Sequence, residues 1–333
     1  MATIKDVARE AGVSVATVSR VINKSPKASQ ASIDTVTSAM HKLGYRPNAA
    51  ARALVNQSTN TIGVLVSDVS DPFFGTLVKA VDTVAHREGK HLLIGNGYHR
   101  AEEERRALEL LINSRCDALV IHSKALPNEE LIEYANEVKT LVLINRHIPQ
   151  LADRCISLDN QKGAYLATDF LIRQGHRNIA CISSSHQIED ADQRIAGYQQ
   201  ALNEHGITLS SSYIEKASPD SEGGEQAMTN LLVKSLPFTA VVAYNDNMAA
   251  GALLVLEENG HSVPEHVSVI GFDDALISLR PRLTTVRYPI QLMAEKATQL
   301  ALALATDAPR ENDPMIFSPT IVRRDSVAQK REP

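Results

Sequence analysis

The sequence predicts a small all-α helix-turn-helix head followed by an α/β body of two parallel-sheet subdomains. Two patterns predict this fold class. Residues 1–60 contain short amphipathic segments separated by glycines, and residues 61–330 alternate aliphatic runs with helical stretches. The chain length of 333 residues agrees with this division, since a chain of this size exceeds one small core and favours two or three domains.

The head begins with a helix signal. Thr3 is followed three residues later by Asp6, a spacing at which a hydroxyl and a carboxylate cap the free backbone N–H groups of a helix. Gly12 stands where that helix must stop, because glycine accepts a positive φ without strain. Ser14 is the expected cap of a second helix. The apolar stripe of that helix is expected to comprise Val15, Val18, Val21 and Ile22.

A third helix is expected from the cap Ser29 to Gly44. Helix, short glycine turn and helix indicate a helix-turn-helix motif, and the alternative is an ordinary helical hairpin at the start of a larger domain. The following stretch, RPNAAARALVNQSTN (46–60), predicts a short helix with nothing to bury against. Such a helix is unstable in isolation, so we expect a hinge that folds only against a partner helix or DNA.

Charge is distributed unevenly between the head and the body. The whole chain has a net charge of −5, but residues 1–60 carry eight Lys/Arg and three Asp/Glu, which leaves −10 on the other 273 residues. A basic head on an acidic body favours a polyanionic partner for the head. Chance clustering of charge on a solvated surface is the alternative.

Several protein classes are disfavoured by what the sequence lacks. No apolar run reaches membrane-spanning length and the start, MATIKDVARE, has no signal-peptide core, so a soluble cytoplasmic protein is expected. The cysteines Cys116, Cys155 and Cys181 form no CxxC pair and are expected to be buried thiols, with no metal and no cofactor.

An enzyme is also disfavoured. GNGYHR (95–100) is not GxGxxG, and neither GxxxxGK[ST] nor GxSxG occurs. SSSH (183–186) reads as a polar loop, because a catalytic Ser and His meet in space and seldom in sequence. We therefore expect no catalytic residue.

The body predicts buried parallel strands joined by helices. Aliphatic runs without alternation are typical of strands buried on both faces, and their alternation with helices predicts right-handed βα units. The expected strands are 61–67, 91–96, 117–123, 140–145, 178–183, 239–244 and 267–272. The expected helices are 74–88, 102–113, 162–174, 194–204, 224–232 and 248–259.

Polar and aromatic residues follow these strands, where open parallel sheets bind ligands. The segments at the strand ends are Asp68–Phe74, Asn145–Arg146, Ser183–His186, Tyr244–Asp246 and Asp273–Asp274. Carboxylate, amide and guanidinium groups bond sugar hydroxyls, and aromatic rings cover apolar C–H faces, so a neutral sugar site is expected. Structural alternatives remain: carboxylates that cap helices, core phenylalanines, an Asn145–Arg146 bridge between the lobes, and an Arg194 pair with Asp190 or Asp192.

A family resemblance joins the two parts. TIKDVAREAGVSVATVSRVIN and GYRPNAAARAL resemble the DNA-binding head and hinge of the lactose/galactose repressor family. DVSDPFFG, VLINR, YNDNMAAGAL and VIGFDD resemble its body, and through it the periplasmic sugar-binding proteins. The resemblance covers essentially the whole chain and implies a periplasmic-binding-protein-like body.

The resemblance implies that the second helix lies in the major groove of DNA. Val15 and Ala16 would help to select the operator by shape, and Arg20 would contact base edges, since its fork matches two acceptors of guanine. Leu54 would wedge into the minor groove. The full set of expected DNA-binding residues is Thr3, Ser14, Val15, Ala16, Thr17, Ser19, Arg20, Asn23, Asn48 and Leu54.

The resemblance also implies a ligand and an assembly. The expected function is a repressor of galactose transport and utilisation genes: a homodimer on double-stranded operator DNA at the nucleoid, released by a small-molecule inducer, D-galactose. The alternative is a repressor of the same family that responds to another sugar or small metabolite. The expected ligand-binding residues are Asp71, Phe73, Phe74, Asn145, Arg146, Arg194, Asn245 and Asp273.

The expected domain boundaries follow from the same patterns. Residues 1–46 form the helix-turn-helix domain and 47–60 the hinge helix and linker. The first effector-binding subdomain spans 61–159 plus about 290–318, and the second spans 160–289 plus about 319–330.

Overall fold

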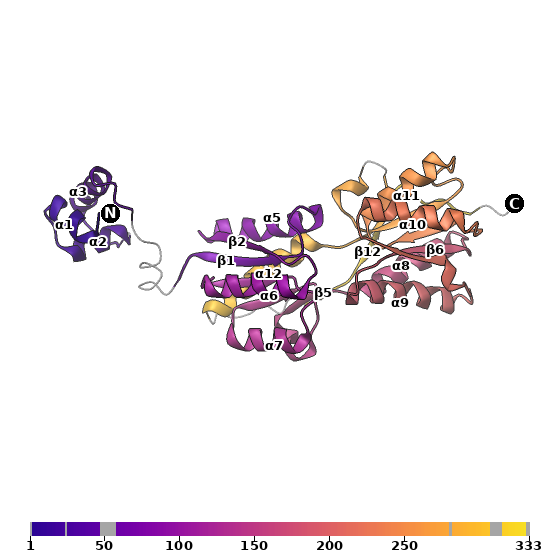
Figure 1. The fold of residues 1–333 in the computed structure, drawn as a ribbon, viewed down its shortest axis with the longest axis horizontal. Coiled ribbons are helices and arrows are strands. Elements are labelled where there is room, and N and C mark those ends of the chain that lie inside the picture. The colour runs from indigo at the N-terminus through magenta and orange to yellow at the C-terminus, as the bar shows by residue number, and fades with distance from the viewer. Residues whose placement is uncertain (1, 24, 47–57, 280–281, 307–314, 331–333) are drawn as a thin grey trace. The chain divides into compact units, whose positions relative to one another are not determined.

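The computed structural model describes residues 2–23, 25–46, 58–279, 282–306 and 315–330. They belong to two compact units, Met1–Thr61 and Ile62–Pro333, each of which is described by itself (Figure 1). Most of the expected hinge, including Asn48 and Leu54, lies outside the described residues.

The head contains the three expected helices. These are α1 (Ile4–Ala11), α2 (Val15–Ile22) and α3 (Gln30–Lys42). Thr3 and Asp6 form a capping box at the start of α1, Gly12 ends that helix at φ +65°, and Ser14 and Ser29 cap α2 and α3. The sequence-based caps of all three helices are therefore confirmed.

The apolar stripe of α2 is narrower than expected. Val18 is fully buried with Val7 and Val36 in the small core of the head. Val15 is 41% exposed, so its predicted place in the buried stripe is wrong. As the first residue of α2, Val15 stays outside the core that forms around Val18.

The first lobe of the body is a six-stranded sheet with helices packed against it. The strand order is β11-β5-β4-β3-β1-β2. The strands are β1 (Thr61–Val66), β2 (His91–Asn96), β3 (Ala118–Ile121), β4 (Leu141–Ile144), β5 (Cys155–Leu158) and β11 (Ile316–Phe317). The helices are α5 (Pro72–Arg87), α6 (Ala101–Asn113), α7 (Asn128–Glu137) and α12 (Ile290–Thr306), together with the 3₁₀ helix η1 (Pro149–Arg154).

The second lobe repeats this architecture with the order β12-β10-β9-β8-β6-β7. The strands are β6 (Ile179–Ser184), β7 (Ile214–Ala217), β8 (Ala240–Ala243), β9 (Ser268–Asp273), β10 (Thr284–Arg287) and β12 (Thr320–Val322). The helices are α8 (Asn160–Arg173), α9 (Glu189–Glu204), α10 (Ser221–Val233) and α11 (Asp246–Glu258), with the 3₁₀ helices η2 (Ser211–Tyr213) and η3 (Leu276–Ser278). β12 pairs antiparallel with β10, so this sheet is parallel except at that edge.

The chain passes between the lobes through short connections after β5, after β10 and after β11 (Figure 1). β11 belongs to the first sheet, and β12, three residues further on, belongs to the second. Segments that follow β1, β3 and β4 of the first lobe and β6, β8 and β9 of the second line one cavity. Both lobes therefore contribute their strand ends to a shared cleft, as open parallel sheets do.

Candidate functional sites

The outer face of α2 presents small side chains to solvent. Val15, Ala16 and Arg20 are exposed, and Thr17 and Ser19 are half-buried. No hydrogen bond or ion pair joins the Arg20 side chain to another described residue, so its guanidinium is available to a partner. A helix of this kind can approach a groove wall closely while one guanidinium reaches a base edge.

Hydroxyl groups at both ends of α2 bond within the helix. The Ser14 Oγ accepts from the Thr17 N–H at 3.1 Å, and the two hydroxyls lie 3.0 Å apart. The Asn23 Nδ2 donates to the Ser19 Oγ at 3.4 Å. These bonds order the polar side chains on the exposed side of the helix.

Thr3 is engaged in its capping box at the start of α1. Its hydroxyl donates to the Asp6 Oδ2 at 2.7 Å, and its Oγ1 accepts from the Asp6 N–H at 3.3 Å. The hydrogen bonds from Thr3 lower the pKa of the Asp6 carboxyl. The side chain is exposed, so it remains accessible at this end of the head.

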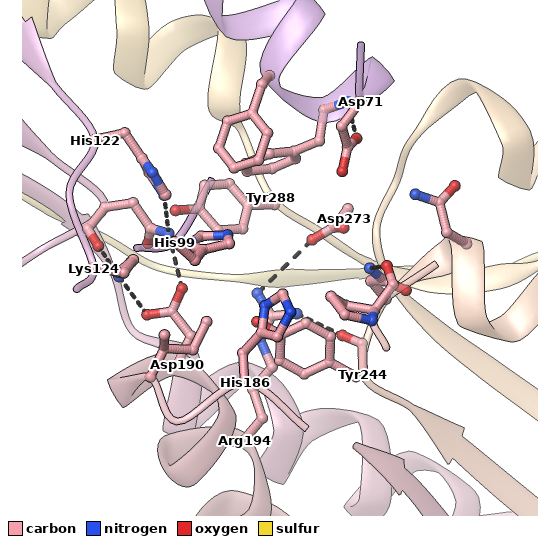
Figure 2. A pocket seen from close by; sticks show the side chains of 17 residues that line it. Asp71, His99, His122, Lys124, His186, Asp190, Arg194, Tyr244, Asp273 and Tyr288 are labelled. Carbon is pink, nitrogen blue, oxygen red and sulfur yellow. Dashed lines mark hydrogen bonds and ion pairs between the residues drawn. The ribbon is translucent and has the colours of Figure 1, made fainter. Parts of the chain in front are cut away.

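The cleft of the body holds a cavity of about 70 Å³ between the lobes. Seven of the eight expected ligand-binding residues line it: Asp71, Phe73, Phe74, Asn145, Arg194, Asn245 and Asp273. Figure 2 shows these side chains converging with three histidines, a lysine and two tyrosines. The structure therefore brings together seven expected residues, of which Asp71 and Asp273 are 202 positions apart in the sequence.

Arg146 differs from the other expected residues, because it does not line this cavity. Its guanidinium donates to the backbone oxygen of Ser123 at 3.0 Å and to the Oδ1 of Asn128, at the start of α7, at 2.7 Å. The expected contact between Arg146 and the ligand is therefore not supported by its position. The Arg146 side chain therefore connects the end of β4 to other segments of the first lobe.

Aromatic rings form one wall of the cavity. Phe73 packs edge-on against Phe74 and against Tyr288, with ring centroids 5.2 and 5.1 Å apart. Phe74 is only 7% exposed and contacts His122 edge-on at 4.8 Å. Phe74 is thus largely a core residue that also lines the cavity.

Arg194, on α9, is held rigidly in the second lobe. Its Nη1 donates to the Tyr244 backbone oxygen at 2.5 Å, and its Nε donates to the Asn160 Oδ1 at 3.0 Å. The guanidinium stacks on the Phe272 ring at 3.6 Å and lies 3.8 Å from the Asp273 carboxylate. Its ion-pair partner is therefore Asp273, and not the Asp190 or Asp192 of its own helix.

Asp273 lies on a strained turn at the end of β9. Its φ is +111° and that of Asp274 is +56°, a region that side-chain-bearing residues rarely adopt. Burial raises the pKa of Asp273 well above its usual value, and the Arg194 charge opposes that shift. Such strain persists only where the surrounding structure enforces it.

Asp246 stabilises that turn through hydrogen bonds to its carboxylate group. Its Oδ2 accepts from the Ala275 N–H at 2.8 Å, and its Oδ1 accepts from the Thr285 hydroxyl at 2.6 Å. A Cβ on Gly271 would lie 2.2 Å from the same Oδ1, so only glycine fits beside the carboxylate. Burial raises the pKa of Asp246 to about 7.

Two expected ligand-binding residues also cap helices. The Asp71 carboxylate accepts from the Phe73 N–H at 2.8 Å at the start of α5. The Asn245 Oδ1 accepts from the Met248 N–H at 2.8 Å, and its Nδ2 donates to the Pro219 oxygen at 2.8 Å. An amide has two donor and two acceptor positions, so Asn245 retains one of each toward the cavity.

Sequence reasoning missed His99 and His122 of the cavity, and it included His186 only within the strand-end segment Ser183–His186. His99 lies between His186 and His122, with ring centroids 5.1 and 5.9 Å away. Burial lowers the pKa of His99 to about 4 and that of His122 well below its usual value, so both rings are neutral at pH 7. His122 directly follows β3, but the expected strand 117–123 contained it, so it was not considered as a residue at a strand end.

Buried polar atoms without a hydrogen-bond partner among the described residues belong to side chains that line this cavity. They are the Nδ1 atoms of His99 and His186, the Oδ1 of Asn145 and the hydroxyl of Tyr288. A buried polar group normally has a hydrogen-bond partner, so a ligand rich in hydroxyls would satisfy them. Within the described ranges, no group of histidines, cysteines and carboxylates is arranged to hold a metal ion.

A helix-turn-helix head and a two-lobed body with a polar cleft are the parts of a ligand-responsive DNA-binding regulator. Residues 3–48 match the family described as bacterial regulatory proteins, lacI family, and residues 168–327 match a periplasmic binding protein-like domain. The chain belongs to the lacI family of bacterial transcriptional regulators.

Individual relatives agree with this assignment. The chain is 57% identical to the HTH-type transcriptional regulator GalR of Escherichia coli strain K12, over 98% of this chain and 96% of that protein. It is 54% identical to GalS of Salmonella typhimurium strain LT2, over 99% and 98%. A lac repressor dimer, solved with operator and the anti-inducer ONPF, is 25% identical over 98% and 99% of the two chains, with a TM-score of 0.84.

These comparisons settle the class of protein. The relatives are transcriptional regulators, and this chain is a DNA-binding transcriptional regulator and not an enzyme. No helix in the described part of the chain is long and apolar enough to cross a membrane.

Proposed function

We propose that this regulator represses genes of galactose transport and utilisation, and that D-galactose releases it from its operator. The observation that carries the proposal is a cavity lining that combines buried polar atoms without a described hydrogen-bond partner with the rings of Phe73 and Phe74. The hydroxyls of a hexose would bond these polar atoms, and its apolar C–H faces would pack against the two phenylalanine rings. Galactose is chosen among hexoses because of the identity to GalR and GalS.

The ligand contacts follow from the geometry of the cleft. Asp273 and the guanidinium of Arg194 would bond hydroxyls from the second lobe, and Asn245 would use its remaining donor and acceptor. Asn145 and Asp71 would do so from the first lobe, because both line the same cavity. A ligand bridging the two lobes favours the closed arrangement over the open one.

Operator recognition is assigned to α2. Arg20 would donate to the O6 and N7 acceptors of a guanine, and Val15 and Ala16 would contact thymine methyl groups or leave space for them. Ser14, Thr17, Ser19, Asn23, Thr3 and Asn48 would bond phosphates or flank the reading face. Leu54 and its twin would wedge into the minor groove at the operator centre.

The assembly proposed is a homodimer on a near-palindromic operator in the cytoplasm, at the nucleoid. Two heads related by a two-fold axis read two half-sites, and the lac repressor of similar fold was solved as a dimer on its operator. The domain boundaries proposed are 1–46, 47–60, 61–159 with about 290–318, and 160–289 with about 319–330. If the sugar lowers the affinity of the regulator for its operator, the sugar must bind the operator complex more weakly than it binds the free regulator.

Isothermal titration calorimetry of the full chain tests the ligand. D-galactose is expected to bind once per chain, and D-glucose and D-ribose are expected to bind at least tenfold more weakly. Failure of galactose to bind, with binding of another sugar or small metabolite, would reject galactose in favour of a different effector for the same regulator.

A further inference from the structure

A buried ion pair joins the two lobes beside the effector cavity. Lys124, which follows β3 in the first lobe, donates from its Nζ to the Oδ1 of Asp190, on α9 of the second lobe, at 2.6 Å. The two side chains are only 2% and 7% exposed. Figure 2 shows the pair at the edge of the cavity, on the opposite side from Asp71.

The other carboxylate oxygen of Asp190 also bonds the first lobe. Its Oδ2 accepts from the Nδ2 of Asn145 at 2.9 Å. Lys124 also donates to the backbone oxygen of Asn145, so three residues form one closed network across the cleft. Both oxygens of a carboxylate from the second lobe are thus held by side chains of the first.

The charges around Asp190 match this arrangement. Burial raises the pKa of the Asp190 carboxyl, but the charges of Lys124 and Arg194 and the bonds from Lys124 and Asn145 lower it overall below its usual value. The carboxylate is therefore ionised when the lobes are together. His99 and His122 face the same network as neutral rings, because burial and the Lys124 charge lower their pKa values.

We propose that Lys124 and Asp190 form an interlobe latch that holds the effector cleft closed before any ligand binds. The latch consists of these two residues and Asn145. Buried charges are tolerated only as a pair, and removal of one partner leaves a desolvated charge that regains water when the lobes separate. Lys124 and Asp190 are thus positioning residues that set the population of the closed state, and with it the effector affinity.

The inference rests on the proposed function only where it concerns effector affinity. A closed cleft before binding reduces the free energy that the ligand must supply, since apparent affinity scales with the population of the competent state. A regulator without the latch would need a higher sugar concentration to leave its operator.

Fluorescence energy transfer between the lobes tests the latch without any ligand. Glu137, at the end of α7, and Glu222, in the first turn of α10, are exposed and are replaced by cysteine for dye labelling. The half-buried Cys116 is replaced by serine in every variant to avoid background labelling. The full-length protein is used throughout.

Single and double charge removals are expected to act in the same direction. Asp190→Asn keeps the shape and an oxygen for Asn145 but leaves Lys124 unpaired, so transfer efficiency in the ligand-free protein is expected to fall. Lys124→Met is expected to act in the same direction. The double variant Lys124→Met/Asp190→Asn removes the ion pair without leaving an unpaired buried charge, so its transfer efficiency is expected to stay below that of the wild type.

The matched control is Asp192→Asn, an exposed carboxylate two residues further along the same helix, which is expected to change nothing. Unchanged transfer in both single variants would overturn the latch, as would a double variant with the transfer efficiency of the wild type. If Asp190→Asn fails to fold, Lys124→Met and the double variant decide the same question.

Effector titration of the same variants separates the latch from the proposed function. D-galactose affinity is expected to fall about tenfold or more in Asp190→Asn and to stay below that of the wild type in the double variant. If the wild type does not bind galactose, the ligand proposal fails, and the transfer experiment still decides the latch.

Discussion

Replacement of Arg194 by methionine should destabilise the second lobe and weaken effector binding together. The guanidinium makes charged hydrogen bonds to the Tyr244 oxygen and to the Asn160 Oδ1, and it lies 3.8 Å from the carboxyl group of the buried Asp273. Hydrogen bonds to charged groups contribute about 1.5–3 kcal/mol each, so their loss predicts a fall of about 3–6 kcal/mol in the free energy of unfolding. Methionine retains an apolar contact with Phe272, which keeps the change largely polar.

Urea unfolding followed by far-UV circular dichroism measures this change, since the chain has no tryptophan. Arg173→Met is the matched control, because Arg173 is 71% exposed and pairs with Asp169 on its own helix at 2.6 Å. An exposed pair of this kind contributes about 0–1 kcal/mol. If Arg194→Met were no more destabilising than Arg173→Met, the inference that the buried contacts of Arg194 stabilise the second lobe would be refuted.

Three further predictions concern the head, the strained turn and the thiols. Val18→Ala, in the core of the head, is expected to cost about 1–3 kcal/mol and to weaken operator binding in a mobility shift while galactose binding stays unchanged. The pKa of Asp246 is raised from 3.8 to about 7, so its contribution to stability is full below about pH 4 and is lost, by about 4 kcal/mol, as the pH rises to about 7. Asp246→Asn should flatten this fall in urea unfolding at pH 4–8, and an unchanged slope would contradict the assignment. Burial raises the pKa of Cys181 to about 12 and raises that of Cys155, so neither should react with Ellman's reagent at pH 8 unless urea is added, and fast native labelling would contradict their burial.

The effector cleft was predictable because buried parallel strands are recognisable as uninterrupted aliphatic runs. The run before Asn145 and the run before Asp273 were both assigned as strands, and the ends of parallel strands meet at one edge of a sheet. Arg194 entered the site through the family resemblance. Its contacts with Tyr244 and Asn160 join three elements and could not be read from local sequence.

Other parts of the site were not predictable, for identifiable physical reasons. Tyr288 follows β10, whose sequence TTVR lacks an aliphatic run, so that strand was not expected. Lys124 resembles a surface residue in sequence, and only its pairing with Asp190 allows its burial. Helix α9 begins five residues earlier than expected, because no serine, threonine or asparagine marks its start at Ile188.

In the head, local signals determined most of the structure. Thr3, Ser14 and Ser29 were found as caps because capping depends on neighbours within three residues. The exposure of Val15 depends instead on how three helices meet, which periodicity does not specify. Val15, one of the residues proposed to read DNA, is thus the member of the expected apolar stripe that lies outside the core.

The central claim is that sugar in the cleft controls operator binding by the head. A mobility-shift titration of the full chain on a near-palindromic operator, with and without saturating D-galactose, tests it most directly, with D-glucose as the control sugar. The account predicts at least a tenfold loss of operator affinity with galactose, which corresponds to about 1.4 kcal/mol of coupling, and little change with glucose. An operator affinity that galactose leaves unchanged would contradict it.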